Sequence, residues 1–514
     1  MHEILRCDAG WIVGVEEGSG HPPPVTAPPA LRTMVGMQSV AEALDRLGEL
    51  AASTTVSTLS AAFDRAGHEL ALVGGPVRDA FLGRPVHDLD FTTDATPEQI
   101  LEIVKPISDA HWDIGRDFGT IGARVAGETV EITTYRADSY DGKSRKPDVV
   151  FGDSLEGDLV RRDFTVNSLA LRLPKIELVD PSGGVEDLIA RVLRTPSAPQ
   201  TSFGDDPLRM MRAARFAAQL GFEVEDGTLA ALEELAPEID RISAERVREE
   251  LSKLLLADRP VPGLRILVDS GLAQRVLPEL PALRLERDEH HRHKDVYEHS
   301  LKVLDQAIDY ERARGKLDSP DLVVRLAALL HDIGKPATRR LEPGGAVSFY
   351  HHDVVGAKLA KKRLRELRYD NDTIAAVARL IELHLRFFGY TDGAWSDSAV
   401  RRYVRDAGSP EQLERLHILS RADVTTRNKR KADMLAFAYD DLEQRIAELA
   451  EEEELAAVRP ELDGEQIMAA LGIRPGREVG EAYRFLLELR LDEGPIGEDA
   501  ARERLLAWWA DRGG

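Results

Sequence analysis

The stretch from Leu72 to Thr93 (LVGGPVRDAFLGRPVHDLDFTT) limits the possible folds of this chain more than any other segment. An apolar run that ends at Val73 predicts a buried strand. The glycine pair Gly74 and Gly75 then lets the backbone turn sharply and approach a ligand without a Cβ in the way. Residues 77–82 suit a short helix that Gly83 ends. Together these features predict an α/β unit.

Two aspartates follow this helix at the spacing of a strand. Asp88 and Asp90 share one face, whereas Leu89 between them points into the core. Neighbouring carboxylates repel each other, and Mg²⁺ relieves that repulsion while it takes further ligands from substrate phosphates. Arg78 and the glycine turn offer a positive charge and backbone N–H groups to those phosphates. An ordinary turn or loop explains either half alone. Both halves in this order predict a two-metal phosphoryl-transfer site, and Glu131 on a later strand is a third candidate acid.

Residues 74–90 resemble the head-domain motif of class II tRNA nucleotidyltransferases, the CCA-adding enzymes, and of their poly(A) polymerase relatives. The family pattern is Gly-Gly-x-Val-Arg-Asp, then Leu-Gly, then Asp-x-Asp, and the match is complete. The resemblance implies a polymerase-β-like palm with a mixed sheet. It also implies that Asp88 and Asp90 are catalytic and bind Mg²⁺, and that three residues before them bind the nucleotide: Gly74, Gly75 and Arg78.

A second motif is Arg161-Arg162-Asp163-Phe164-Thr165-Val166-Asn167. Adjacent arginines before an aspartate are consistent with a surface ion pair. They also suit a nucleotide site, in which guanidinium groups bind phosphate and a carboxylate accepts a hydrogen bond from a ribose hydroxyl. In the family, Arg-Arg-Asp-Phe-Thr-x-Asn is associated with ribose recognition. The resemblance therefore makes Arg162, Asp163 and Asn167 candidate nucleotide-binding residues.

A third motif, DDPLRMMRAARF at residues 205–216, opens the helical remainder of the chain. Pro207 suits the first turn of a helix with Asp206 near its N-cap, and Asp206 and Arg209 share a face. A cap with an intrahelical ion pair is one explanation. Alternatively, the carboxylate accepts from an exocyclic amine while the guanidinium donates to ring acceptors, which selects cytosine and adenine over uracil and guanine.

The family uses this third motif as a protein template for choosing the base. Asp205 stands where the family more commonly has glutamate, so its individual role is open. Besides Asp206 and Arg209, the resemblance makes Arg212 and Arg215 candidate nucleotide-binding residues. A capped amphipathic helix is predicted over 242–256, with Glu245 and Arg248 expected to brace the template helix or to form ordinary ion pairs. The polar segment 136–148 lies where the family has a mobile loop that helps to switch from C to A addition.

A separate set of histidines and aspartates lies between residues 285 and 430. Such residues on several helices can converge inside a helical bundle and bind metal. The ordered series resembles the HD phosphohydrolase superfamily, and it implies a divalent transition metal and the hydrolysis of a phosphoester. A metal site retained mainly for structure is the alternative. The candidate ligands are His299, His331, Asp332, His352, His384 and Asp423.

These motifs predict an α/β head followed by an all-α neck, an HD domain and a helical tail. The 514-residue chain is 31% charged and 43% hydrophobic, which is typical of a soluble globular protein. No apolar run is long enough to span a membrane, and the single cysteine, Cys7, suits the cytoplasm. The net charge of −23 argues only weakly against a nucleic-acid partner. We expect a disordered proline-rich extension at 1–36, the head at 37–198, the neck at 199–284, the HD domain at 285–430 and the tail at 431–514. Translation could start at Met1, Met34 or Met37.

The expected function is the addition of CCA to the 3′ end of tRNA from CTP and ATP, with release of pyrophosphate. Three alternatives remain open at this point. The chain could be a poly(A) polymerase or a partial enzyme that adds only CC or only A. It could be an HD hydrolase whose head only binds RNA, or a non-catalytic RNA-binding adaptor. The intact Asp88-x-Asp90 pair and the complete Arg-Arg-Asp argue against the last two.

Overall fold

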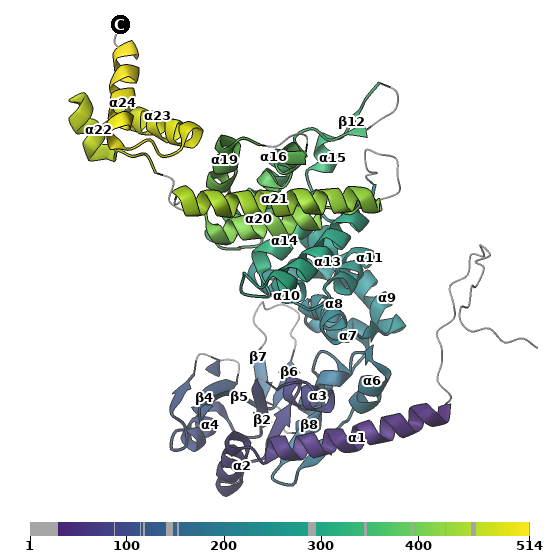
Figure 1. The fold of residues 1–514 in the computed structure, drawn as a ribbon. Coiled ribbons are helices and arrows are strands. Elements are labelled where there is room, and N and C mark those ends of the chain that lie inside the picture. The colour runs from purple at the N-terminus through teal and green to yellow at the C-terminus, as the bar shows by residue number, and fades with distance from the viewer. Residues whose placement is uncertain are drawn as a thin grey trace, which may run out of the picture.

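The computed structural model describes residues 29–512 with short gaps. Figure 1 shows an α/β head at one end, a long helical part beside it and a small helical unit at the C-terminal end. The predicted fold class, a mixed-sheet head followed by a helical remainder, is confirmed, and the described part of that remainder adds only three strands of two residues each. Within the described residues, no helix is both long and apolar enough to cross a membrane. The gaps are residues 87, 114, 117–118, 140–147, 152–153, 286–294, 344–346, 392–394, 427 and 454–458.

A seven-stranded mixed sheet forms the centre of the head, in the order β3-β4-β5-β2-β1-β8-β9. Strand β1 pairs antiparallel with β2 and with β8, whereas β2 pairs parallel with β5. The end of β1 therefore lies beside the start of β2 and the start of β8. The strands are β1 (Leu70–Val73), β2 (Leu89–Thr93), β3 (Ala110–Trp112), β4 (Thr120–Val125), β5 (Glu128–Thr134), β8 (Ala170–Leu173) and β9 (Glu177–Val179).

Local sequence features set the ends of several head elements. Helix α4 (Pro97–Val104) starts at a capping box formed by Thr96 and Gln99. Ala126 and Gly127 turn the chain between β4 and β5, and both have positive φ. The other head elements are α1 (Pro29–Ala51), α2 (Thr54–Ala66), α3 (Gly75–Phe81), β6 (Arg136–Ser139), β7 (Asp148–Phe151), α5 (Leu155–Val160), α6 (Gly184–Ala190) and β10 (Val192–Leu193).

The predicted proline-rich extension differs in part from the structure. Residues 1–28 lie outside the described residues, whereas α1 begins at Pro29 and includes the last eight residues of the predicted extension. Proline is well tolerated in the first turn of a helix, because its missing N–H has no intrahelical acceptor there. The predicted boundary at residue 36 consequently lies within α1. Residues 140–147 of the predicted switching loop also lie outside the described residues.

The neck and the HD region form one continuous helical body. Buried Arg325 joins them: its Nη1 donates to the carbonyl oxygens of Leu255 (2.7 Å) and Ala257 (2.8 Å), and its Nε donates to Glu311 (3.1 Å). The helices of this body are α7 (Pro199–Asp205), α8 (Leu208–Leu220), α9 (Asp226–Leu235), α10 (Ala244–Leu255), α11 (Val261–Asp269), α12 (Leu272–Val276), α13 (Val296–Arg314), α14 (Leu322–Leu330), α15 (Lys335–Thr338), α16 (His352–Glu366), α17 (Asn371–Leu383), α18 (Phe388–Thr391), α19 (Asp397–Ala407), α20 (Pro410–Ala422) and α21 (Lys429–Glu453), with the short strands β11 (Glu223–Val224), β12 (Arg340–Leu341) and β13 (Val347–Ser348).

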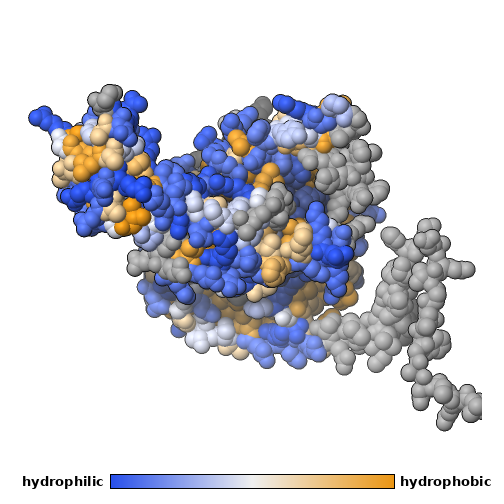
Figure 2. Space-filling model, turned by 45° about the horizontal axis from the view of Figure 1, so that its top comes forward, coloured by the Kyte–Doolittle hydropathy of each residue, from blue (hydrophilic) through white to orange (hydrophobic). Residues whose placement is uncertain are grey.

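A small unit with its own apolar core ends the described chain. It consists of α22 (Gly464–Leu471), α23 (Arg477–Glu493) and α24 (Glu498–Arg512), and its core includes Leu462 and Leu486. Figure 2 shows apolar residues gathered on this unit. The predicted boundary at 430 lies inside α21, whose apolar residues join the main core rather than that of the small unit.

Candidate active site

The paired aspartates lie where the sheet brings three loops together. Asp88 is exposed just before β2, and Asp90 is half-buried on it, while Leu89 is buried. Asp90 lies in register with Glu131 on the parallel neighbour β5. Burial, with the charges of Glu131 and Asp88, raises the pKa of Asp90 to about 6 against the opposing effect of Arg162. This cluster of acids accumulates negative charge that a divalent cation would neutralise.

The glycine turn lies beside these acids because β1 and β2 are antiparallel. Gly74 has a φ of +72°, and a Cβ at this position would lie 3.1 Å from Nη1 of Arg162. The backbone conformation therefore favours glycine, and the missing Cβ also gives the guanidinium of Arg162 room to approach. The Gly74 N–H donates to the carbonyl oxygen of Leu169 (3.0 Å), so it does not serve as a free phosphate donor. The turn instead fixes the approach of Arg162 and the start of α3.

The Arg-Arg-Asp motif reaches the same place because it precedes β8. Asp163 is buried and accepts from Nε (2.8 Å) and Nη2 (2.6 Å) of Arg212, and from the side chain of Asn167 (3.0 Å). Burial alone would raise the pKa of Asp163, but Arg212 and Asn167 lower it to about 2. Asn167 also accepts from Arg78 (2.7 Å). The three motifs are thus joined by direct hydrogen bonds.

Asp206 and Arg209 do not pair with each other. Asp206 accepts from Nη2 of Arg246 (3.0 Å) and from the backbone N–H of Leu208 (3.2 Å). Arg209 donates to Oγ of Ser202 (2.8 Å) and to the carbonyl oxygen of Arg161 (2.6 Å). The expected position of Asp206 near the N-cap is confirmed, since Asp206 directly precedes Pro207, the N-cap of α8, and follows the last residue of α7. Each group of the pair is therefore oriented by a separate partner.

One cavity of about 540 Å³ is lined by twelve of the head and template residues that the sequence singles out, though not by Glu131. The head supplies one wall and the first neck helices supply the other. Phe216 lies in the cavity lining, and the guanidinium groups of Arg78, Arg212 and Arg215 lie 5.3, 5.3 and 4.1 Å from its ring centre. The twelve predicted residues are Gly74, Gly75, Arg78, Asp88, Asp90, Arg162, Asp163, Asn167, Asp206, Arg209, Arg212 and Arg215. Asp205 is not among the lining residues.

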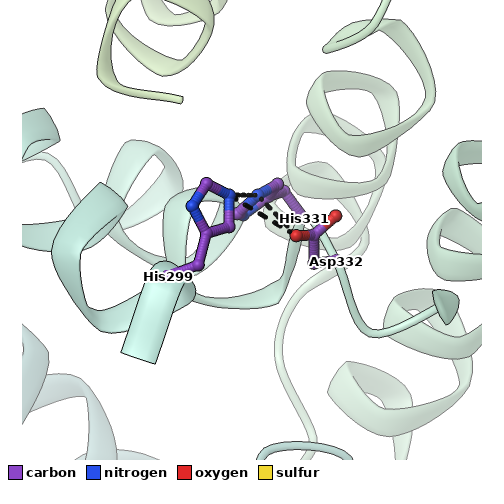
Figure 3. Close-up of side chains that lie close together, drawn as sticks. All are labelled: His299, His331 and Asp332. Carbon is purple, nitrogen blue, oxygen red and sulfur yellow. Dashed lines mark hydrogen bonds and ion pairs between the residues drawn. The ribbon is translucent and has the colours of Figure 1, made fainter. Parts of the chain in front are cut away.

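The six predicted HD residues also come together, in the helical body. His299, His331 and Asp332 form one group and Asp332, His352 and His384 a second, and the ligand atoms within each group lie within 4.8 Å of one another. Figure 3 shows the first group, with both imidazoles directed at the Asp332 carboxylate. Asp423 completes the set, with Oδ1 2.9 Å from Nε2 of His299. Asp332 belongs to both groups and is placed to bridge them.

Backbone contacts orient three of these histidines as metal ligands. Nδ1 of His331, His352 and His384 lies 2.9, 2.8 and 2.6 Å from the carbonyl oxygens of Ala328, Phe349 and Ile381. A proton on Nδ1 leaves Nε2 free for metal. Nε2 of His352 and of His384 is buried without a hydrogen-bond partner. Burial would lower the pKa of His331, but Asp332 and Asp423 raise it to about 10. The residues present thus fit a cation between them.

Comparisons with known proteins agree with this arrangement. The "Poly A polymerase head domain" family matches residues 70–194, the "Probable RNA and SrmB- binding site of polymerase A" family matches 221–283, and the "HD domain" family matches 296–428. The A-adding tRNA nucleotidyltransferase of Deinococcus radiodurans is 34% identical over 450 residues, which are 86% of this chain and 95% of that protein. The chain belongs to the tRNA nucleotidyltransferase and poly(A) polymerase family.

Other members of this family match over shorter segments or at lower identity. The CCA-adding enzyme of Limosilactobacillus reuteri is 42% identical over 212 residues, and the chain spans about half (51%) of its length. The Bacillus stearothermophilus CCA-adding enzyme in complex with CTP has a TM-score of 0.64 at 23% identity, covering 92% of this chain and 98% of that one. The Thermotoga maritima CCA-adding enzyme complexed with tRNA has a TM-score of 0.57 at 20% identity, covering 90% and 98%. These structures share the fold.

Sequence reasoning about this nucleotidyltransferase missed the α10 side of the cavity. Arg246 and Lys253 of α10 line it, and Glu250 between them accepts from Nε of Arg215 (2.6 Å). The expectation that Glu245 and Arg248 brace the template helix is wrong, because they contact Arg368 after α16 instead. Residues 246, 250 and 253 follow an i, i+4, i+7 pattern, which is the only sequence feature that points to this face.

Proposed function

We propose that this chain is a CCA-adding enzyme. It transfers CMP, CMP and then AMP from CTP and ATP to the 3′ end of tRNA. In each step the terminal hydroxyl oxygen bonds to the α-phosphorus of the nucleotide, the bond between the α- and β-phosphates breaks, and pyrophosphate leaves. The observation that supports this most is the single cavity that joins the acid pair to the Arg-Arg-Asp motif and to Asp206 and Arg209.

Asp88 and Asp90 are proposed to hold Mg²⁺ at the sheet edge, where burial and the neighbouring charge of Glu131 raise the pKa of Asp90. The chemistry that Mg²⁺ supplies when bound is charge neutralisation of the triphosphate and activation of the attacking hydroxyl. Arg78 and Arg162 are proposed to bind phosphate. Asp163 positions Arg212 through its two-pronged hydrogen bond, which is a role distinct from the predicted direct contact with ribose.

Base selection is assigned to Asp206 and Arg209. Cytosine and adenine each present an amino group beside a ring acceptor, so a carboxylate and a guanidinium can serve both bases. Uracil and guanine present a carbonyl where the amine is needed, which leaves the carboxylate unpaired and is strongly discriminating. Because Arg246, Ser202 and the Arg161 carbonyl hold the two groups, their geometry is prepared before the nucleotide arrives. The tRNA would be recognised mainly by the shape of its acceptor arm, in the cytoplasm.

The test uses purified protein, Mg²⁺ and tRNA that ends at the discriminator base, with CTP and ATP supplied singly and together. CCA addition predicts a product that is three nucleotides longer with both nucleotides and then stops. CTP alone should give two additions. A long A-tail would refute the assignment in favour of poly(A) synthesis.

A-addition alone is the second candidate, because the relative aligned over 86% of this chain is named an A-adding enzyme. In that case tRNA ending at the discriminator base stays unextended with CTP. Only tRNA that already ends in CC is extended, by a single A. The same gel distinguishes the two candidates.

We further propose that the six-residue cluster in the helical body holds a divalent transition metal and hydrolyses a phosphoester such as a 2′,3′-cyclic phosphate or a phosphomonoester. Support comes from the imidazoles fixed through Nδ1. Further support comes from the buried Nε2 atoms of His352 and His384, which make no hydrogen bond, the former 3.4 Å from Oδ1 of Asp332. The chemistry supplied by the bound metal would be activation of water. Lys335, whose Nζ lies 2.8 Å from Oδ2 of Asp332, adds a positive charge next to the site.

A further inference from the structure

Helix α10 has two polar faces that serve different parts of the molecule. Arg246 and Lys253 line the nucleotide cavity, and Glu250 between them holds Arg215. On the other face, Arg248 donates to the Arg368 carbonyl oxygen (2.6 Å) and Ser252 hydrogen-bonds the hydroxyl of Tyr369 (2.8 Å). Figure 1 shows α10 on the side of the helical body that faces the head. The cavity wall opposite the Asp88–Asp90 pair therefore includes α10.

Seven basic side chains line the cavity, and six of them have partners in the protein. Arg78, Arg162 and Arg212 pair with Asp79, Asp158 and Asp163. Arg209, Arg215 and Arg246 are held by Ser202, Glu250 and Asp206. Lys253 is exposed, and within the described part of the chain it has neither an ion pair nor a hydrogen bond. It is a positive charge in the cavity that remains available to a ligand.

We propose that Lys253 binds a phosphate in the last two nucleotides of the RNA that receives the new nucleotide. This inference rests on the proposed nucleotidyl transfer. The triphosphate has its own positive charges on the head wall, at Arg78 and Arg162. The RNA places only its terminal hydroxyl at the acid pair, so the phosphates behind that hydroxyl extend away from the sheet toward the neck wall. Lys253 lies on that wall.

The side chain also suits a substrate that moves. After each addition the RNA end shifts by one nucleotide, so the phosphate nearest to α10 changes position. An arginine held by a carboxylate presents one fixed geometry, whereas a lysine is a point charge on a flexible stem. A free lysine can therefore follow successive phosphates, while the six fixed side chains keep the nucleotide site constant.

The test compares Lys253→Gln and Lys253→Arg with a matched control, Lys105→Gln, which removes an exposed lysine of the head that does not line the cavity. RNA affinity is measured by fluorescence anisotropy on an acceptor-arm hairpin over a series of salt concentrations. Lys253→Gln should weaken binding about tenfold at low salt and should lower the log–log salt slope by about one. Lys253→Arg should restore most of the RNA affinity. In both Lys253 variants, KM for CTP should equal that of the wild type.

A neutral methylphosphonate at the last or the penultimate linkage identifies the phosphate. On the hairpin with the contacted linkage neutralised, Lys253→Gln should have no further effect, whereas a neutral linkage in the distal stem should leave the effect intact. The proposal is overturned if Lys253→Gln raises KM for CTP while RNA binding is unchanged. It is also overturned if the losses from the variant and from both terminal neutral linkages simply add, or if Lys105→Gln gives the same loss. Binding is read without catalysis, so a wild-type protein that binds but does not extend RNA would refute the proposed function alone.

Discussion

At the scale of single residues, the environment of Asp90 links proton release to metal binding. Its pKa of about 6, which burial and Glu131 raise, means that the carboxyl is protonated in the metal-free protein at lower pH. A cation must displace that proton, so the apparent Mg²⁺ affinity should fall about tenfold per pH unit below 6 and stay constant well above it. Mg²⁺ titrations of the transfer rate at pH 7.5, 6.5 and 5.5 measure this dependence.

Glu131→Gln is the control for this electrostatic account. Removing the neighbouring charge should lower the pKa of Asp90, so the onset of the affinity loss should move to lower pH. An onset that stays near pH 6 in this variant would mean that burial alone sets the pKa. A Mg²⁺ requirement independent of pH down to 5.5 would contradict the assignment of Asp90 as a ligand.

Short-range spacing was sufficient to predict most cavity residues. Some site residues lie two or three positions apart, as do Asp88 and Asp90, and Asp206 and Arg209. Their relative placement depends only on the local strand or helix and not on the fold of the rest of the chain. Phe216 was not predicted, because an aromatic residue in an apolar helical pattern looks like ordinary core. Three guanidinium groups lie over its ring. One of them belongs to Arg78 of the head, so the contact depends on how α8 packs against the head and cannot be predicted from a local sequence pattern.

At the scale of elements, α10 shows how a correctly predicted helix can still give wrong contacts when the wrong face is taken to pack against its neighbour. Residues 245 and 248 differ by only one or two positions from 246 and 250, but each residue turns the helix by about 100°. The sequence identified the amphipathic helix correctly. It did not identify which of the two charged faces meets α8, because both carry acidic and basic residues.

Glu250→Gln tests the face that does meet α8. Glu250 is only 4% exposed and is the acceptor for Nε of Arg215, so its loss leaves a buried guanidinium without its counter-charge. We expect a loss of unfolding free energy of about 3 kcal/mol and a raised KM for CTP, measured by urea unfolding and initial rates. Glu245→Gln, on the other face and exposed, should cost less than about 0.5 kcal/mol. Equal losses in the two variants would contradict this division of α10.

The buried His417 of α20, which packs between α19 and α21, should make the protein less stable in mild acid. Burial lowers the pKa of His417 from 6.5 to about 4, so the unfolded chain binds a proton at higher pH than the folded chain does. Stability from this group is full above pH 6.5 and is lost as the pH falls toward 4, by roughly 3 kcal/mol in total. Urea unfolding at pH 7 and pH 4.5 should show a smaller difference for His417→Gln than for the wild type. Glu443, whose pKa is lowered from 4.5 to about 2, contributes its stability above pH 4.5 and loses it mainly at lower pH, so it does not obscure the comparison.

At the scale of the whole molecule, the nucleotide cavity and the HD cluster draw on different helices and strands, so their activities should be separable. Asp88→Ala should reduce nucleotidyl transfer by at least about 10³-fold and leave RNA binding and phosphoester hydrolysis intact. Asp332→Ala should do the reverse and also lose bound transition metal, measured by elemental analysis. The fold should survive in Asp88→Ala, since Asp88 is exposed. Loss of both activities in either variant would contradict the separation of the two sites.

Arg325 gives the chain a property that the positions of the motifs do not suggest. Every residue of the nucleotide cavity lies before residue 254, so a fragment that ends after the neck would contain all of them. That fragment would lack Arg325, whose guanidinium donates to the Leu255 and Ala257 carbonyl oxygens. It would also lack Glu311, the carboxylate that pairs with Arg325. The last turn of α10 would then fray next to Lys253 and Glu250. We therefore expect the smallest fragment that transfers nucleotides at the full rate to be longer than the part that lines the cavity and to extend through α14.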